Sequence, residues 1–218
     1  MRAAWHRFMA PLTPGVRALL LVLTISYLVA VAGVFSHAFN LYAPLALSGA
    51  EFWKGKVWQI VTYSLLPASL FDFLFNWVMV LFLGACLEKL WSLRQLWAYC
   101  LISAIGAGLA KVLIEPASPR MMVGTAPIVF GLLAAWGYLC PNEKVLLYFV
   151  WEVTVRKAAI ILTIFSALLM VPCSGAKTVL IMLFGAVAAL MSLWLESRIL
   201  HGRQSQTVAS GRMGRLEL

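Results

Sequence analysis

Residues 124–150 read GTAPIVFGLLAAWGYLCPNEKVLLYFV and contain two kinds of segment. From about 122 to 140 the chain is apolar over roughly the 20 residues that a helix needs to cross the hydrocarbon core of a bilayer. From 141 to 155 it is too short and too charged to cross, and we expect a strand at the membrane interface or entering it shallowly. The stretch therefore predicts a membrane span followed by a surface connection.

Five more apolar blocks of similar length lie on either side of this stretch. They run over about 17–36, 68–86, 95–114, 156–171 and 177–197. The chain is 63% hydrophobic and 11% charged, a composition that excludes an ordinary soluble globule. Because helices satisfy their backbone polar groups within one segment, we predict an all-α polytopic membrane protein with six transmembrane helices. The first block is too long for the ~7–15-residue core of a signal peptide and is counted as a span.

Basic residues outnumber acidic ones by 17 to 8, and their distribution indicates topology. If both termini face the cytoplasm, twelve of the 17 basic residues lie on that side. The five that remain outside are Lys54, Lys56, Lys111, Arg120 and Lys177. This is the positive-inside distribution, so we predict an N-in/C-in orientation. The expected partner is the lipid bilayer rather than a nucleic acid, and the expected location is a bacterial inner (plasma) membrane, as an integral multi-pass protein.

The domain organisation follows from these blocks. We predict a cytoplasmic N-terminal segment (1–16), one six-span membrane domain (17–200) and a flexible cytoplasmic tail (201–218). The external loop at about 37–67 carries aromatic and apolar residues throughout, which is typical of a segment at the membrane interface. The four cysteines have no metal-site spacing, and neither a metal nor a cofactor is expected.

Small residues on three of the blocks predict close helix packing, because backbones can approach one another where side chains are small. The glycines concerned are Gly106 and Gly108 in the third block, Gly131 in the fourth and Gly185 in the sixth.

The run from 52 to 110 resembles the rhomboid intramembrane serine proteases. Rhomboids typically read there as Gly-x-x-Trp-Arg, Thr-Tyr, His-x-x-Phe-Asn and Gly-x-x-x-Glu. The corresponding residues here are Gly55, Trp58, Thr62, Tyr63, Phe75, Asn76, Gly84 and Glu88. The similarity extends over roughly 50–197 and implies a rhomboid-like bundle of six helices.

The same resemblance fails at the catalytic positions. Rhomboids carry a catalytic serine in Gly-x-Ser-Gly at the head of the fourth span, where this chain has Gly124-Thr125-Ala126-Pro127. The histidine that would activate the serine falls near Thr178. The chain has only three histidines, at positions 6, 37 and 201, so the sixth span contains none.

The second span also departs from the family pattern. Asp72 stands where the family has a histidine that helps to hold the oxyanion, Pro67 replaces an earlier histidine, and Gln59 stands where an arginine is usual. A carboxylate has the wrong sign to stabilise developing negative charge. Asp72 and Asn76 share a helix face. One interpretation is that they form a polar pocket open to the outside. The other is that the Asp72 carboxylate is hydrated or bonded to Thr178, Thr125 or the backbone. The candidate cavity residues are Asp72, Asn76, Gly124 and Thr125.

Three hypotheses about function remain after this comparison. The leading one is a catalytically inactive rhomboid-like protein, not an enzyme, that binds or escorts single-span transmembrane clients. The second is a divergent rhomboid serine endopeptidase using a relocated dyad (His37 with Ser64, Ser69 or Ser174) or Thr125. The third is a small transporter or ion pathway centred on Asp72 and Asn76.

Overall fold

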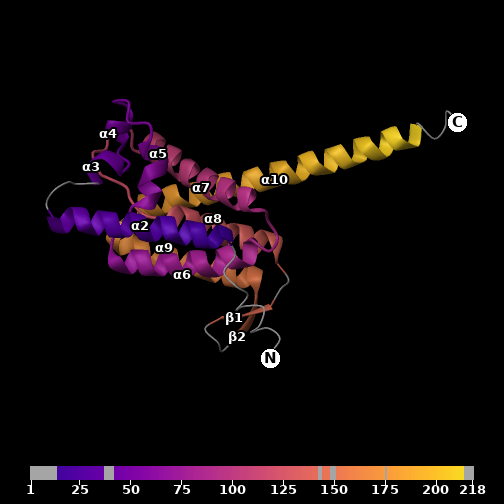
Figure 1. Ribbon diagram of the computed structural model, residues 1–218, viewed down its shortest axis with the longest axis horizontal. Coiled ribbons are helices and arrows are strands. Elements are labelled where there is room, and N and C mark those ends of the chain that lie inside the picture. The colour runs from indigo at the N-terminus through magenta and orange to yellow at the C-terminus, as the bar shows by residue number, and fades with distance from the viewer. Residues whose placement is uncertain (1–13, 37–41, 142–143, 148–150, 175, 214–218) are drawn as a thin grey trace.

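The computed structural model describes residues 14–36, 42–141, 144–147, 151–174 and 176–213. Six long helices lie at the positions of the six predicted blocks, which confirms the helical part of the sequence prediction. They are α2 (Pro14–Ser36), α6 (Leu70–Leu87), α7 (Leu93–Ile114), α8 (Ala126–Leu139), α9 (Val155–Ser174) and α10 (Ala176–Met213). Figure 1 shows them gathered in one bundle, from which the far end of α10 projects. The central helix is α8, which packs against α6, α7, α9 and α10.

Among the residues described, four helical segments are long and apolar enough to cross a membrane. These segments are Pro14–Gly33, Leu70–Leu87, Leu93–Ile114 and Lys177–Leu195. α8 is a shorter apolar helix of 14 residues, about 21 Å long against a hydrocarbon core of about 30 Å. That α8 and α9 also cross the membrane, which would give six spans, stays a prediction. The orientation of the chain in the membrane also stays a prediction.

α8 begins later than the predicted span, which started at about residue 122. Met122 instead forms an antiparallel bridge with Leu47: each backbone N–H donates to the other's carbonyl, at 2.8 and 3.0 Å. Gly124 then has a φ of +123°, a backbone conformation that side chains other than glycine's rarely adopt. The first helical turn therefore starts at Ala126, inside the bundle.

The described part of the external loop (residues 42–67) folds as short helices against the end of α7. They are α3 (Tyr42–Leu45), α4 (Gly49–Phe52), α5 (Gln59–Thr62) and the 3-10 turn η1 (Tyr63–Leu65). The Ser48 hydroxyl donates to the Ser118 carbonyl at 3.1 Å. Trp53 and Trp58 remain exposed, as expected for a segment at a membrane interface.

The connection after α8 differs from the strand predicted for 141–155. β1 (Lys144–Leu147) and β2 (Trp151–Thr154) form an antiparallel pair, in the register Lys144↔Thr154 to Leu147↔Trp151. Pairing two strands satisfies backbone N–H and C=O groups that a lone strand at a membrane would leave without partners.

The C-terminal segment, predicted as a flexible cytoplasmic tail at 201–218, is helical over its described part, and its flexibility stays a prediction. α10 continues as one helix of 38 residues to Met213, and residues 214–218 lie outside the described part. No proline interrupts residues 176–213, so the backbone can continue its helical hydrogen bonds. At about 57 Å the helix is much longer than the hydrocarbon core, and its end projects from the bundle (Figure 1).

The predicted close packing at small residues is confirmed between α7, α8 and α10. A Cβ atom placed on Gly185 would lie 2.6 Å from the Ser103 carbonyl oxygen, and one on Gly131 would lie 2.5 Å from the Ser103 hydroxyl. A Cβ atom on Gly106 would lie 2.7 Å from that of Ala188. These three helices therefore meet at backbone distance, which fixes their mutual register.

Candidate functional site

The head of α8 is held in place by the external loop. The Gly124 N–H donates to the Tyr63 carbonyl at 3.2 Å, and the buried Tyr63 hydroxyl donates to the Ala104 carbonyl of α7 at 2.7 Å. Burial raises the pKa of Tyr63, so its hydroxyl stays a proton donor at any physiological pH. Thr125 is the N-cap residue but its side chain makes no capping hydrogen bond. The Thr-Tyr motif thus positions the Gly-x-x-Pro turn.

Ala126 occupies the first helical position and is 5% exposed. It belongs to a buried apolar cluster that also contains Phe130 of α8 and Ile181 and Met182 of α10. The surroundings of the family's nucleophile position are therefore hydrocarbon.

The register of α10 against α8 can be read from Ser103. Its hydroxyl donates to the Pro127 carbonyl at 2.6 Å, and its carbonyl oxygen is the atom closest to Gly185. Ser103 of α7 therefore contacts α8 at Pro127 and α10 at Gly185. Thr178 lies seven residues, or about 10 Å, before Gly185 along α10, and its match to the family's histidine stays a prediction.

Asp72 caps the first turn of α6 together with Ser69. The Ser69 hydroxyl accepts from the Asp72 N–H at 3.1 Å, and Asp72 Oδ2 accepts from the Ala68 N–H at 3.1 Å. Asp72 Oδ1 accepts from Asn76 Nδ2 at 2.7 Å, and Asn76 is 3% exposed. Both carboxylate oxygens thus have partners in this chain, as expected for an anion at a helix N-terminus.

Asp72 and the head of α8 form one site. A Cβ atom on Gly124 would lie 3.7 Å from Asp72 Oδ2, so the carboxylate stands against the glycine turn. The structure thereby brings Asp72 and Asn76 of α6 together with Gly124, in the turn before α8, three of the four candidate cavity residues. Of the two arrangements open from sequence, the hydrogen bonds favour the carboxylate bonded to the backbone.

Two of the serines considered as relocated nucleophiles have structural roles. Ser64 is 2% exposed and donates to the Val61 carbonyl at 2.7 Å, while Ser69 caps α6. His37 and the side chain of Ser174 lie outside the described part. Among the described residues, no group of three or more His, Cys, Asp or Glu side chains could hold a metal ion.

Gln59, at the position where an arginine is usual, holds the external loop together. It is fully buried; its Oε1 accepts from the Ser48 N–H and its Nε2 donates to the Pro44 carbonyl, both at 3.4 Å. Pro67 lies nearby and accepts from the Tyr42 hydroxyl at 3.1 Å. Gln59 and Pro67, which stand where the family has an arginine and a histidine, therefore both stabilise the fold of the loop.

Glu88 is a residue whose role sequence reasoning missed. Its two carboxylate oxygens accept from the Gly15 and Val16 N–H groups, both at 2.8 Å. A Cβ atom on Gly84 would lie 2.9 Å from a methyl carbon of Val16. The Gly-x-x-x-Glu motif thus joins the end of α6 to the start of α2. The signal that could have found this role is the Gly-x-x-x-Glu motif itself.

One protein-family model matches the chain: that of the Rhomboid domain, over residues 54–199. The match covers the site helices α6 to α9 and the part of α10 that faces them. No curated protein sequence matches the chain.

Proposed function

The chain belongs to the rhomboid family, and we propose that it is a catalytically inactive member that binds or escorts transmembrane client segments. As a rhomboid-like membrane protein it contacts lipid along its apolar helices. We further propose six spans, with both termini in the cytoplasm of a bacterial cell, on the basis of the basic residues of the sequence.

The observation that carries the proposal is the apolar surrounding of Ala126. A serine nucleophile needs a base within hydrogen-bond reach, and the side chains clustered with Ala126 are those of residues such as Ile181 and Met182. No histidine occurs in residues 177–199. Asp72, which stands at the oxyanion side, carries the wrong charge for that role.

Client binding is supported by the unequal packing of the helices. α9 packs mainly on α8 and α10, while α6 packs on α8 and α2. Phe71 and Leu74 of α6 are exposed, at 72% and 52%, and so are Ile164 and Leu168 of α9, at 55% and 64%. The family resemblance implies a mobile fifth span, here α9, and a mobile first loop that admit a client helix to a central polar cavity. The exposed apolar side chains of α6 and α9 would contact the sides of the client helix, and Asp72 and Asn76 would lie at its end.

The test compares binding and cleavage of a single-span reporter in membranes. We expect the native chain to co-purify with the reporter and to leave it uncut. Ala126→Ser alone should not react with a serine-directed fluorophosphonate, because it has no base. Ala126→Ser combined with Thr178→His, the position that the resemblance gives to the histidine, should react with it. Cleavage by the native chain, or failure of the reporter to bind, would contradict the proposal.

The two alternative functions gain less support. Of the alternative nucleophiles, Ser64 and Ser69 have hydroxyl groups with structural partners, while the side chain of Ser174 lies outside the described part. An ion pathway through Asp72 would need a carboxylate available to the ion, whereas both oxygens accept hydrogen bonds from this chain. An ion-flux assay that compares the native chain with Asp72→Asn separates this alternative from a capping role. A capping role predicts no ion flux in either protein, whereas an ion pathway predicts flux that Asp72→Asn abolishes.

A further inference from the structure

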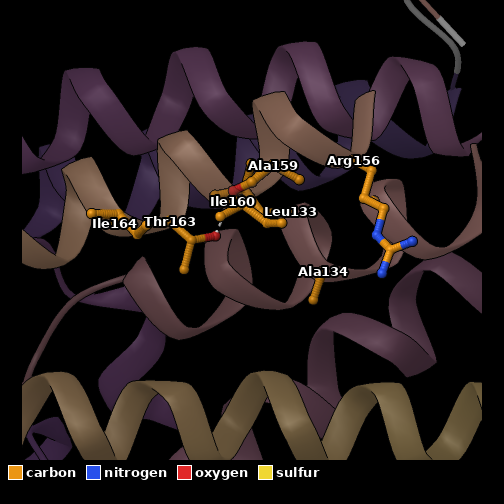
Figure 2. Close-up of a pocket in the computed structure, with 8 residues that line it drawn as sticks. Leu133, Ala134, Arg156, Ala159, Ile160, Thr163 and Ile164 are labelled. Carbon is orange, nitrogen blue, oxygen red and sulfur yellow. Dashed lines mark hydrogen bonds between the residues drawn. The ribbon is translucent and has the colours of Figure 1, made fainter. Parts of the chain in front are cut away.

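A lateral groove of about 330 Å³ runs between α8 and α9. Ala134 and Gly137 contribute to it from α8, and Arg156, Ile160, Thr163 and Ile164 from α9. Figure 2 shows the Arg156 side chain at one end, with Thr163 and Ile164 toward the other. From Arg156 to Ile164 the groove extends over eight helical residues, or about 12 Å.

Small side chains create this groove. α8 and α9 approach closely where a Cβ atom on Gly137 would lie 3.1 Å from that of Ala159. One turn earlier, the methyl group of Ala134 leaves space that a larger side chain would fill. The Thr163 hydroxyl donates to the Ala159 carbonyl at 2.7 Å, so it is satisfied within its own helix. The groove is therefore apolar except at the guanidinium end.

Arg156 gives that end a permanent positive charge. It is the second residue of α9 and is exposed, and the positive end of the helix dipole adds to its charge. A guanidinium group matches the oxygens of a phosphate bidentately. A phosphate at the end of an apolar groove is the chemistry of a phospholipid.

We propose that this groove binds one anionic phospholipid, with the phosphate on Arg156 and an acyl chain along Ile160 and Ile164. The charge at one end and the apolar length at the other complement such a molecule.

The experiment measures lipid binding to the purified full-length protein by native mass spectrometry. The probes are phosphatidylglycerol and phosphatidylcholine with identical acyl chains. We expect phosphatidylglycerol to bind about tenfold more tightly, because the ammonium group of phosphatidylcholine offsets the charge of its phosphate and is repelled by Arg156. Arg156→Gln should reduce this preference to near unity, and Arg156→Lys should retain part of it.

Two further variants make the result specific. Lys157→Gln removes the same charge from the next, also exposed, residue, which does not line the groove, and should leave the preference unchanged. Ala134→Leu fills the groove and should weaken binding of both lipids. Equal losses for Arg156→Gln and Lys157→Gln would overturn the proposal in favour of diffuse attraction. Unchanged binding in Ala134→Leu, or displacement of the lipid by a single-span peptide with an acidic flank, would also overturn it. Thermal unfolding of each variant checks that it is folded.

Discussion

Asp72 is a carboxylate in the first turn of an apolar helix, a position where an unpaired charge would be costly. Three features offset this cost: the Ala68 N–H, the Asn76 amide and the helix N-terminus itself. The carboxylate in turn satisfies the amide of Asn76, which is almost fully buried. Asp72 therefore acts as a helix cap at the position where the resemblance implies an oxyanion-binding histidine.

The cap predicts an order of stability among substitutions at position 72. Asp72→Ala leaves the buried Asn76 amide without its acceptor and should destabilise the fold by about 1–3 kcal/mol. Asp72→Asn keeps one acceptor oxygen and should cost less. Unfolding of the purified protein, monitored by heat or denaturant, measures both. Ser69→Ala is the matched control for loss of the cap alone, at about 1 kcal/mol. Equal stability of the native chain and Asp72→Ala would exclude the capping role.

Glu115, at the end of α7, predicts an acid sensitivity of the external loop. Its hydrogen bond with Lys111 holds the pKa of Glu115 below its usual value. A lowered pKa in the folded state stabilises the fold above the unfolded value of about 4.5. That contribution is lost as the pH falls through the folded pKa. Because Gly49 packs against the Glu115 backbone, we expect proteolysis of the loop to increase below about pH 4.5.

Glu115→Gln provides the control for this acid effect. It removes the titrating group, so the part of the pH dependence below about pH 4.5 should disappear. The loop of this variant should be as accessible to protease at neutral pH as the native loop is in acid. An unchanged acid profile in Glu115→Gln would assign the sensitivity to another group.

At the scale of elements, the bundle is joined by contacts at helix ends as much as by its apolar faces. Glu88 closes the N-terminus of α2, where Pro14 starts the helix and the next two N–H groups have no partner within it. Gly84 lets Val16 approach. Since lipid tails are as apolar as leucine side chains, such polar and close-packed contacts contribute specificity that burial alone does not supply.

Glu88→Ala should detach the start of α2 from α6. Two charge-assisted hydrogen bonds are lost, for a cost of about 2–4 kcal/mol. Increased hydrogen exchange at Gly15 and Val16, with a lower unfolding temperature, is the expected result. Glu51→Ala serves as the control, because its partners Lys54 and Lys56 form ion pairs at the surface, where such pairs contribute little. If both variants behave alike, the Glu88 contact does not hold α2.

At the scale of the whole molecule, α8 connects two different sites. Its first residue, Ala126, lies at the degenerate catalytic centre, and Gly137 lies 11 residues, or about 16 Å, further along beside the proposed lipid groove. The two sites thus stand at opposite ends of the central helix. A client site on the external side and a lipid site on the cytoplasmic side follow from the predicted orientation.

Thiol labelling tests that orientation on the full chain. With the native cysteines replaced, Lys54→Cys should react with a membrane-impermeant maleimide in intact cells, because it lies in the external loop. Gln204→Cys should react only after the membrane is permeabilised. The reverse pattern would overturn the N-in/C-in topology, and with it the placement of Arg156 in the cytoplasmic leaflet.

The sequence alone determined the family and the positions of six helices. The absence of a serine and a histidine at the catalytic positions is what the resemblance implies. Hydrophobic blocks indicate helices because the bilayer imposes a length on each span, and small residues such as Gly106 and Gly185 indicate contact faces. The predicted start of the fourth block differs from the structure at residue 122, which pairs with Leu47.

Only the tertiary structure decided which residues meet. Glu88 and Gly15 are 73 residues apart in sequence, and neither composition nor periodicity relates them. Whether Thr178 stands beside Ala126 depends on the register of α10, which Ser103 and Gly185 set by contact at backbone distance. The physical reason is that hydrophobicity places a helix in the membrane but exerts no force along or around its axis. The register of a helix, and the face that it turns toward its neighbours, come from the shapes of those packed neighbours, which exist only once the chain has folded.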